Sequence, residues 1–138
     1  MSLPAGFTAD LVALLETASV GVYGTSIFVS SRAVLPTGDG PFLVILETGG
    51  APPEHTHNST SAPAYQRPAA EILAHGATFE ATMTMARAAY SALFVRNTLI
   101  GATHYRSITP VGEPGDVGLD KSGRITIAFN VSVIKRPS

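Results

Sequence analysis

The sequence predicts a single α+β domain, in which two helices pack on one face of a mostly antiparallel sheet of about five strands. Three observations predict this fold. The 138 residues have room for one hydrophobic core but not two. Two segments have apolar residues at helical spacing, and several short apolar runs are typical of strands. Single helices interrupt the runs of strands, in the order α-β-β-β-α-β-β, which favours α+β over a parallel α/β sheet.

The first helix is expected close to the N-terminus. Its apolar stripe consists of Phe7, Leu11, Leu14, Leu15 and Ala18. Thr8 is the expected N-cap, and Asp10 in the first turn suits the positive end of the helix dipole. Gly21 and Gly24 are expected to end the helical region.

Three strands are expected before the second helix. The first covers Ser26–Ser31, and the second, Phe42–Glu47, is apolar at nearly every position, which predicts burial on both faces. The third covers Tyr65–His75. Pro68 cannot donate a ladder hydrogen bond, so this strand should lie at an edge or contain a bulge.

The second helix is expected from Phe79 to about Val95, with Thr78 as its N-cap and Glu80 in its first turn. Its predicted buried stripe is Phe79, Met83, Ala86, Tyr90, Leu93 and Phe94. Polar side chains lie opposite that stripe, so the helix should lie on a sheet.

Two more strands are expected after this helix, at Leu99–Thr109 and Arg124–Lys135, and the second alternates apolar and polar residues regularly. Two long loops are also expected. Residues 51–64 are polar, contain three prolines and have no periodicity, and residues 110–123 are rich in glycine. Loops of this length are usually either functional or mobile, and the second is expected to project from the domain.

Composition excludes several classes of function. Nine basic and ten acidic residues give a net charge of −1, so no global basic field attracts nucleic acid. The absence of cysteine excludes disulfides, cysteine-ligated zinc and a cysteine nucleophile. No apolar run is long enough for a transmembrane helix, and residues 1–6 do not resemble a signal peptide, so a cytosolic product without a membrane partner is expected.

His55 and His57 have the spacing that best suits a metal site, because alternate residues of an extended segment point the same way. Glu54 could add an oxygen ligand. Zinc sites usually need three or four protein ligands, and His75 and His104 could supply them only if the fold brings them close. A solvated polar loop is therefore the favoured interpretation, and no metal is expected.

No pattern typical of catalysis is present. The sequence has no nucleophile elbow, no phosphate-binding loop and no dinucleotide fingerprint. The segment Asp116–Gly123 resembles a calcium loop only superficially, because it lacks the third-position ligand and the final glutamate. We therefore expect neither enzymatic activity nor a cofactor.

Three arginines, Arg67, Arg106 and Arg124, lie on or beside predicted strands and could line one face of the sheet. A basic stripe would require the fold to align them. A few solvated arginines are the favoured interpretation.

Several short motifs, taken in order, carry a resemblance to a known family. Glu47–Gly50 follows an apolar strand, and Tyr65–Pro68 opens the next strand after a polar loop. Gly115–Arg124 then leads into Phe129–Val131. Over Gly24 to Lys135 the chain resembles the minor capsid or tail terminator proteins of long-tailed bacteriophages and prophages. It departs from the family's usual Val-Arg-Gly before the second helix, where it has an alanine and a histidine before the glycine.

The resemblance implies a structural virion protein without catalytic residues. Such subunits form a ring, commonly six-fold, that caps the tail tube and contacts the head connector. The chain would be made in the host cytoplasm and located at the head-proximal end of the tail. DNA would pass through a neutral or acidic lumen without specific binding. Another neck or head-completion protein stays open as an alternative, as does, less favoured, a small metal-binding enzyme using His55 and His57.

A ring subunit needs adaptable contact surfaces, and the segments 51–64 and 110–123 are the best candidates. The residues expected at subunit or partner contacts are Glu54, His55, His57, Asn58, Tyr65, Arg67, Asp116, Asp120 and Arg124.

Overall fold

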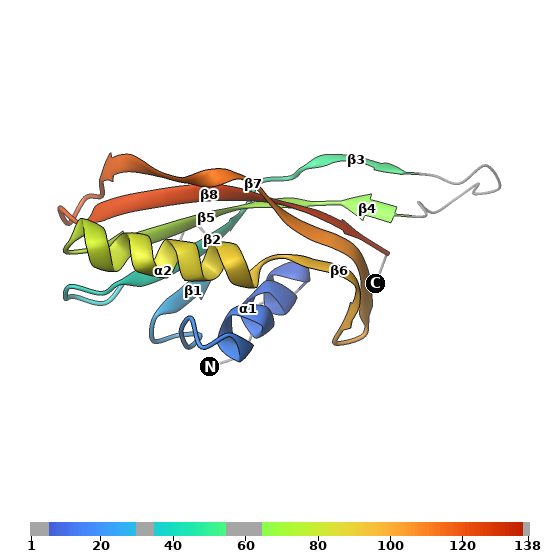
Figure 1. Cartoon of the computed structure of the whole chain (residues 1–138), viewed down its shortest axis with the longest axis horizontal. Coiled ribbons are helices and arrows are strands. Elements are labelled where there is room, and N and C mark those ends of the chain that lie inside the picture. The colour runs from blue at the N-terminus through green and yellow to red at the C-terminus, as the bar shows by residue number, and fades with distance from the viewer. Residues whose placement is uncertain (1–5, 30–34, 55–64, 137–138) are drawn as a thin grey trace.

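A computed structural model describes residues 6–29, 35–54 and 65–136. Within them lie two helices and eight strands (Figure 1). The helices are α1 (Phe7–Thr17) and α2 (Phe79–Ala92). The strands are β1 (Ile27–Val29), β2 (Phe42–Glu47), β3 (Ala51–Glu54), β4 (Tyr65–Arg67), β5 (Ala69–Gly76), β6 (Val95–Ile100), β7 (Thr103–Leu119) and β8 (Ile125–Lys135).

The strands form one mixed sheet. Its order is β1-β2-β5-β8-β4-β3, while β7 pairs with β8 and β6 pairs with β7. β1 runs parallel to β2, so the prediction of a mostly antiparallel sheet of about five strands is wrong. A parallel pair needs a long connection that returns to the same end of the sheet, and residues 30–41 are long enough to provide it. Nothing in their composition signals the crossover.

Two predicted strands are each divided in two. The strand expected over Tyr65–His75 breaks at Pro68 into β4 and β5, both of which pair with β8. The strand expected over Leu99–Thr109 is instead a hairpin of β6 and β7, which turns at Gly101 with φ +60°. Glycine is favoured in that left-handed conformation, because a Cβ atom makes it strained.

The loop expected over residues 110–123 is mostly strand. β7 continues to Leu119 and pairs with β8 along its length. The register shifts between Val111 and Gly115 and again between Asp116 and Gly118. Bulges of this kind let a glycine-rich strand stay paired without regular alternation. In the same way, the first residues of the loop expected over 51–64 form β3, which pairs with β4.

Both helices lie on the same side of the sheet (Figure 1), as predicted. The core between them and the sheet includes Leu11, Leu15, Met85, Ala89, Leu43, Ile72, Ile108, Ile127 and Val131, all buried. The predicted burial of β2 on both faces is confirmed, since Phe42–Ile45 are all buried. No helix among the described residues is long and apolar enough to cross a membrane.

The helix caps follow the predictions in part. Thr78 caps α2, where its Oγ1 accepts a hydrogen bond from the Ala81 N–H at 3.2 Å. The N-cap of α1 is Gly6, which has no side chain to bond, while the expected cap Thr8 is buried inside the helix.

The buried stripe of α2 agrees with the predicted one in part. Of the predicted residues, Ala86 and Leu93 are buried, and Met83 and Tyr90 pack against the core. Phe79 and Phe94 are instead 48% and 51% exposed, and Thr82, Met85 and Ala89 are buried in addition. Thr82 can face the core because its hydroxyl donates to the Thr78 carbonyl at 2.7 Å. Small residues on this stripe allow the helix to lie close to the sheet.

Candidate functional site

The β3–β4 hairpin forms one end of the molecule, which we call the arm end, together with β6 and the start of β7 (Figure 1). Of the predicted contact residues, Glu54 lies on β3, while Tyr65 and Arg67 lie on β4. His55, His57 and Asn58 lie outside the described residues.

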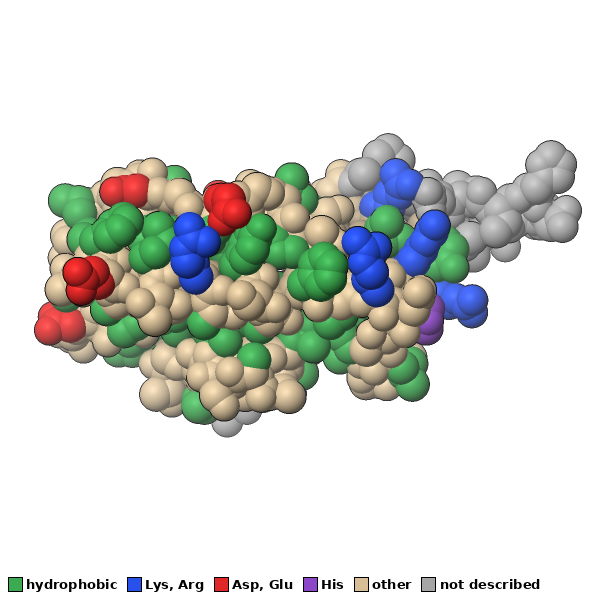
Figure 2. All heavy atoms as spheres, viewed as in Figure 1, with side chains coloured by type: hydrophobic (Ala, Val, Ile, Leu, Met, Phe, Trp, Pro, Cys, Tyr) green, Lys and Arg blue, Asp and Glu red, His purple; other side chains and the backbone are tan. Residues whose placement is uncertain are grey.

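Three arginines meet in one pocket at the arm end, which we call the basic pocket. Its volume is about 330 Å³, and its lining residues are Arg67, Arg96, Asn97, Arg106, Ser107 and Ile134. Figure 2 shows most of the visible Lys and Arg side chains gathered over this end, and the visible Asp and Glu side chains toward the opposite end. None of the six lining residues is acidic. The lining residues thus carry guanidinium, amide and hydroxyl groups, which are chemically suited to a carboxylate or phosphate.

The pairing of the strands explains why these arginines converge. Arg96 on β6 lies opposite Ser107 on β7. Tyr105 and Ser107 pair with consecutive residues of β8, which leaves Arg106 as the extra residue of a bulge. A bulge redirects the side chain of its extra residue, and here that side chain lines the pocket.

Aromatic rings lie beside two of the guanidinium groups. The Arg106 guanidinium lies 5.5 Å from the centroid of the Tyr65 ring, and that of Arg96 lies 5.2 Å from the Phe94 ring. Cation–π contacts of this kind hold exposed guanidinium groups against the faces of the rings. Tyr65 and Arg67, both predicted contact residues, thus lie with Arg106 at one place.

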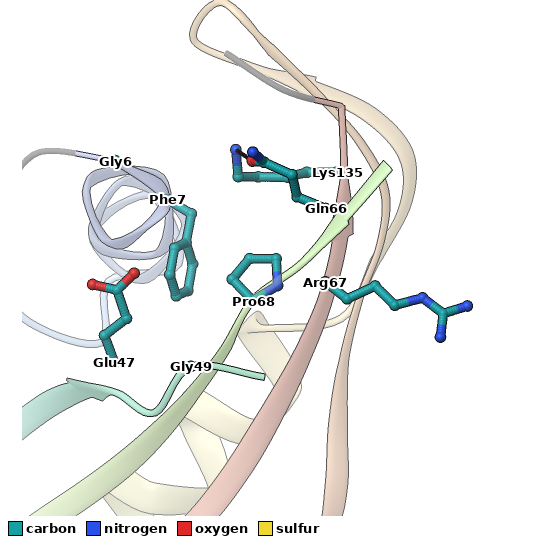
Figure 3. A pocket seen from close by; sticks show the side chains of 8 residues that line it. All are labelled: Gly6, Phe7, Glu47, Gly49, Gln66, Arg67, Pro68 and Lys135. Atoms are coloured by element: carbon teal, nitrogen blue, oxygen red, sulfur yellow. Dashed lines mark hydrogen bonds between the residues drawn. The ribbon is translucent and has the colours of Figure 1, made fainter. Parts of the chain in front are cut away.

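The opposite face of the same strands holds a buried polar cluster under α1. Tyr105 hydrogen-bonds the Asp10 carboxylate, and Lys135 Nζ donates to Gln66 Oε1 at 2.8 Å. Burial lowers the pKa of Lys135 although the charge of Asp10 opposes the shift. Burial, and then the bond to Asp10, raise the pKa of Tyr105, which stays a neutral donor. In Figure 3, Arg67 points away from this side of the sheet.

The turn between β7 and β8, at the other end of the sheet, is held by a different cluster, which we call the turn cluster. Asp120 Oδ1 accepts from the N–H groups of Ser122 and Arg124, at 2.9 and 2.8 Å. Its Oδ2 lies 3.3 Å from His75 Nδ1 and 3.5 Å from Arg124 Nη1. Through this contact with His75, the Asp120 carboxylate joins β5 to the β7–β8 turn. His75 Nδ1 also lies 3.0 Å from Thr126 Oγ1 on β8.

Arg124 extends this cluster to a third segment. Its Nη2 donates to the Pro36 carbonyl at 2.6 Å and its Nε to the Gly38 carbonyl at 3.1 Å. The guanidinium also lies 5.1 Å from the Phe42 ring centroid, and the residue is buried. Arg124 is therefore a structural clamp for residues 36–38 rather than a solvated side chain.

Burial changes the ionisation of the turn cluster. It is the largest influence on His75 and lowers its pKa, although Asp120 acts in the opposite direction and Arg124 in the same one. Burial alone would raise the pKa of Asp120. The N–H groups of Arg124 and Ser122 and the charges of His75 and Arg124 outweigh burial, so the pKa of this carboxyl lies below its usual value.

The second half of β7 forms an exposed edge near the turn cluster. Among the described strands, β6 accompanies β7 only as far as Ile108. Beyond it Glu113 and Asp116 are exposed, as are Val117 and Leu119, at 60% and 70%. We call these four residues the acidic edge.

The structure divides the predicted contact residues between the two ends of the sheet. Asp120 and Arg124 contact each other at the turn cluster, and Tyr65 and Arg67 lie at the arm end. Arg124 does not join Arg67 and Arg106, so a stripe of the three does not form. Arg96 was missed, because no local pattern links it to arginines on other strands.

No group of three or more His, Cys, Asp or Glu side chains that could hold a metal ion lies within residues 6–29, 35–54 and 65–136. His75 is part of the turn cluster, whereas His104 lies on β7 opposite Leu99 in the β6–β7 hairpin. The fold does not gather these histidines into a ligand set.

Comparisons with known proteins identify a shared fold. Neither a protein-family model nor a curated protein matches the chain. A solved chain from a structure titled "Virion of native gene transfer agent (GTA) particle" matches with a TM-score of 0.55. The match covers 92% of this chain and 84% of that chain, at 12% sequence identity. At this identity the similarity establishes a common fold.

Proposed function

We propose that this chain is a structural protein of a phage-like virion, and that it forms the tail terminator ring. The observation that carries the proposal is the fold, which is shared over nearly the whole chain with a component of a gene transfer agent virion. The sequence motifs that resemble tail terminator proteins support the finer assignment. In this role the protein has no catalytic activity and needs no cofactor.

Physical features of the surface support assembly into a ring. A cyclic ring needs two unlike patches on each subunit, one complementary to the other. The basic pocket and the acidic edge differ in charge and lie on different parts of the molecule. Only 14% of the residues are charged, which leaves much of the surface compatible with contact to other subunits.

The proposed partners are further copies of this chain, the tail tube protein and the head–tail connector. The ring is proposed as a hexamer at the head-proximal end of the tail. DNA would cross its lumen without specific binding. A net charge near zero suits this passage, because a basic lumen would retain DNA through its phosphates.

The test is removal of this protein from the particle that contains it, followed by electron microscopy of the products. Without a tail terminator, we expect tails of abnormal length that are not joined to heads. Complementation with the intact chain should restore both length and joining. Tails of normal length that lack heads would instead indicate another neck protein, and normal particles would contradict a role in assembly.

A further inference from the structure

We infer that the end of β7 in one subunit inserts apolar side chains into an apolar groove beside α2 of a second copy of this chain. The inserted side chains are those of Val117 and Leu119, which we call the β7 tip. The inference rests on the proposed ring, because it names the two unlike surfaces through which the ring would close.

The β7 tip exposes two large apolar side chains at the end of a strand. Val117 is 60% exposed and Leu119 is 70% exposed. Asp116 and Gly118 pair with consecutive residues of β8, so Val117 is the extra residue of a bulge. The Asp116 carboxylate accepts from the Gly118 N–H at 2.9 Å and is thus engaged with its own backbone. Single exposed apolar residues are common on protein surfaces, but adjoining ones favour a contact site.

The groove lies between α2 and the segment that connects α1 to β1, and we call it the α2 groove. Its volume is about 510 Å³, and none of its described lining residues is charged. These residues are Ser19, Val20, Ser26, Pro41, Ala81, Thr84, Met85 and Ala88. Because a cavity of about 150 Å³ already accommodates benzene, the groove has room for the Val117 and Leu119 side chains.

Two hydroxyl groups of the α2 groove are already hydrogen-bonded within the chain. Ser26 Oγ accepts from the Val22 N–H at 3.0 Å, and Thr84 Oγ1 donates to the Glu80 carbonyl at 2.8 Å. A partner that covers these hydroxyls therefore need not replace a hydrogen bond to water. An apolar occupant suits this lining better than a polar one.

The β7 tip and the α2 groove lie at opposite edges of the sheet. Among the described strands, β1 and β7 are the outer ones in the order β1-β2-β5-β8-β7. Ser26 and Pro41 of the groove directly precede β1 and β2, whereas the tip ends β7. Unlike surfaces at opposite edges suit a head-to-tail contact, in which each copy uses its tip on one neighbour and its groove on the other.

Charges beside the two surfaces are complementary. Each wall of the groove has an exposed glutamate at its border. The Glu16 carbonyl accepts from the Ser19 N–H at 3.0 Å, and Glu80 directly precedes Ala81. Beyond the tip, Lys121 is exposed in the β7–β8 turn. Opposite charges around an apolar contact favour one orientation of the two copies.

Cross-linking of the full chain tests the contact directly, because the chain has no cysteine of its own. A tagged Leu119→Cys variant and an untagged Ala88→Cys variant are mixed 1:1 and treated with a short bismaleimide. We expect a covalent dimer that contains one copy of each variant. A chain that carries both substitutions should give a ladder of covalent oligomers, since every copy then links to two neighbours.

A matched control separates this contact from chance collisions. Leu99 is 67% exposed, as Leu119 nearly is, but lies on β6 at the arm end. A mixture of Leu99→Cys and Ala88→Cys should give no covalent dimer. Circular dichroism of every variant checks that the fold is kept.

Substitutions that place a charge in the contact should weaken assembly. We expect Leu119→Glu and Ala88→Glu each to raise the concentration for half-assembly about 100-fold, because the contact would bury a carboxylate among apolar groups. Leu99→Glu and Ala13→Glu introduce the same charge at exposed positions outside both surfaces and should leave assembly unchanged. Mass measured against concentration gives all four values.

Three results would overturn the inference. The first is assembly of the wild type without a cross-link between Leu119→Cys and Ala88→Cys, which would leave the groove to another virion protein. The second is equal cross-linking in Leu119→Cys alone, which would place two tips together. The third is a wild-type protein that stays monomeric at every concentration. Electron microscopy of particles lacking the protein tests the proposed function separately, since the ring could close through other surfaces.

Discussion

Arginine has different surroundings at the two ends of this sheet. At the turn cluster, Arg124 is buried, donates to two carbonyl groups and lies beside a carboxylate. At the arm end, Arg96 and Arg106 are exposed and lie over aromatic rings while they line the same pocket. The first arrangement uses the guanidinium to stabilise the fold, and the second presents it at the surface. Substitutions at the two ends should therefore separate stability from assembly.

The largest effect is expected in the core that both ends share. Ile127 on β8 is fully buried, so Ile127→Asp places a charge where no water can reach it. We expect the unfolding free energy to fall by about 4 kcal/mol or more, so that neither end of the sheet stays folded. Ser132→Asp, on an exposed position of the same strand, should change stability by less than about 0.5 kcal/mol. A soluble Ile127→Asp variant that unfolds cooperatively would show that the core is wrongly assigned.

The comparison of the arginines predicts the next largest effect. Arg124→Ala removes the donor to the Pro36 and Gly38 carbonyls and one of the positive charges beside Asp120. We expect a loss of about 2–4 kcal/mol, measured by urea unfolding. Arg106→Ala removes an exposed side chain and should cost less than about 1 kcal/mol. If both substitutions lowered the unfolding free energy equally, the claim that only Arg124 stabilises the fold would be wrong.

A smaller effect is expected at the buried cluster beneath the arm end. Tyr105→Phe removes the hydroxyl that bonds the Asp10 carboxylate and joins α1 to the sheet. The loss should be about 1–3 kcal/mol, because the carboxylate is left without that donor. Thermal unfolding of the variant and the wild type at pH 7 measures it. Equal thermal stability of the variant and the wild type would mean that water fully replaces the Tyr105 hydroxyl as the partner of Asp10.

The smallest effect concerns the pH dependence of the turn cluster. The pKa of His75 is lowered in the folded protein, so the unfolded chain binds more protons near and below pH 6.5. Stability from this group is therefore present above that pH and is lost as the pH falls. We expect His75→Gln to have a shallower decline in unfolding free energy between pH 7 and 5 than the wild type. A steeper decline would contradict the direction of the shift.

The elements with regular patterns could be predicted from the sequence. β2 has the predicted bounds because its apolar run is uninterrupted, and β8 differs by one residue because its alternation is regular. Thr78 was identified because capping is a local interaction. The prediction of strand bounds failed where those bounds depend on the neighbouring strand with which a segment pairs. β7 extends to Leu119 because β8 pairs with it through bulges, and glycine-rich composition alone suggests a loop.

The candidate surfaces could be predicted only in part, for the same physical reason. Asp120 and Arg124 are close in sequence, so a turn could bring them together. Arg67, Arg96 and Arg106 lie on three strands, and their meeting depends on the pairing of β4, β6, β7 and β8. The division of Tyr65–His75 at Pro68 and the hairpin at Gly101 create that meeting. At Pro68 an edge strand or a bulge was expected, and the hairpin was not predicted.

The central claim is that copies of this chain form a closed ring in a virion. A symmetry-resolved reconstruction of the particle containing it tests the claim most directly, because it gives the copy number and the contacts together. We predict a ring, six-fold as proposed, at the head-proximal end of the tail. A single copy, or copies that do not touch one another, would contradict the claim.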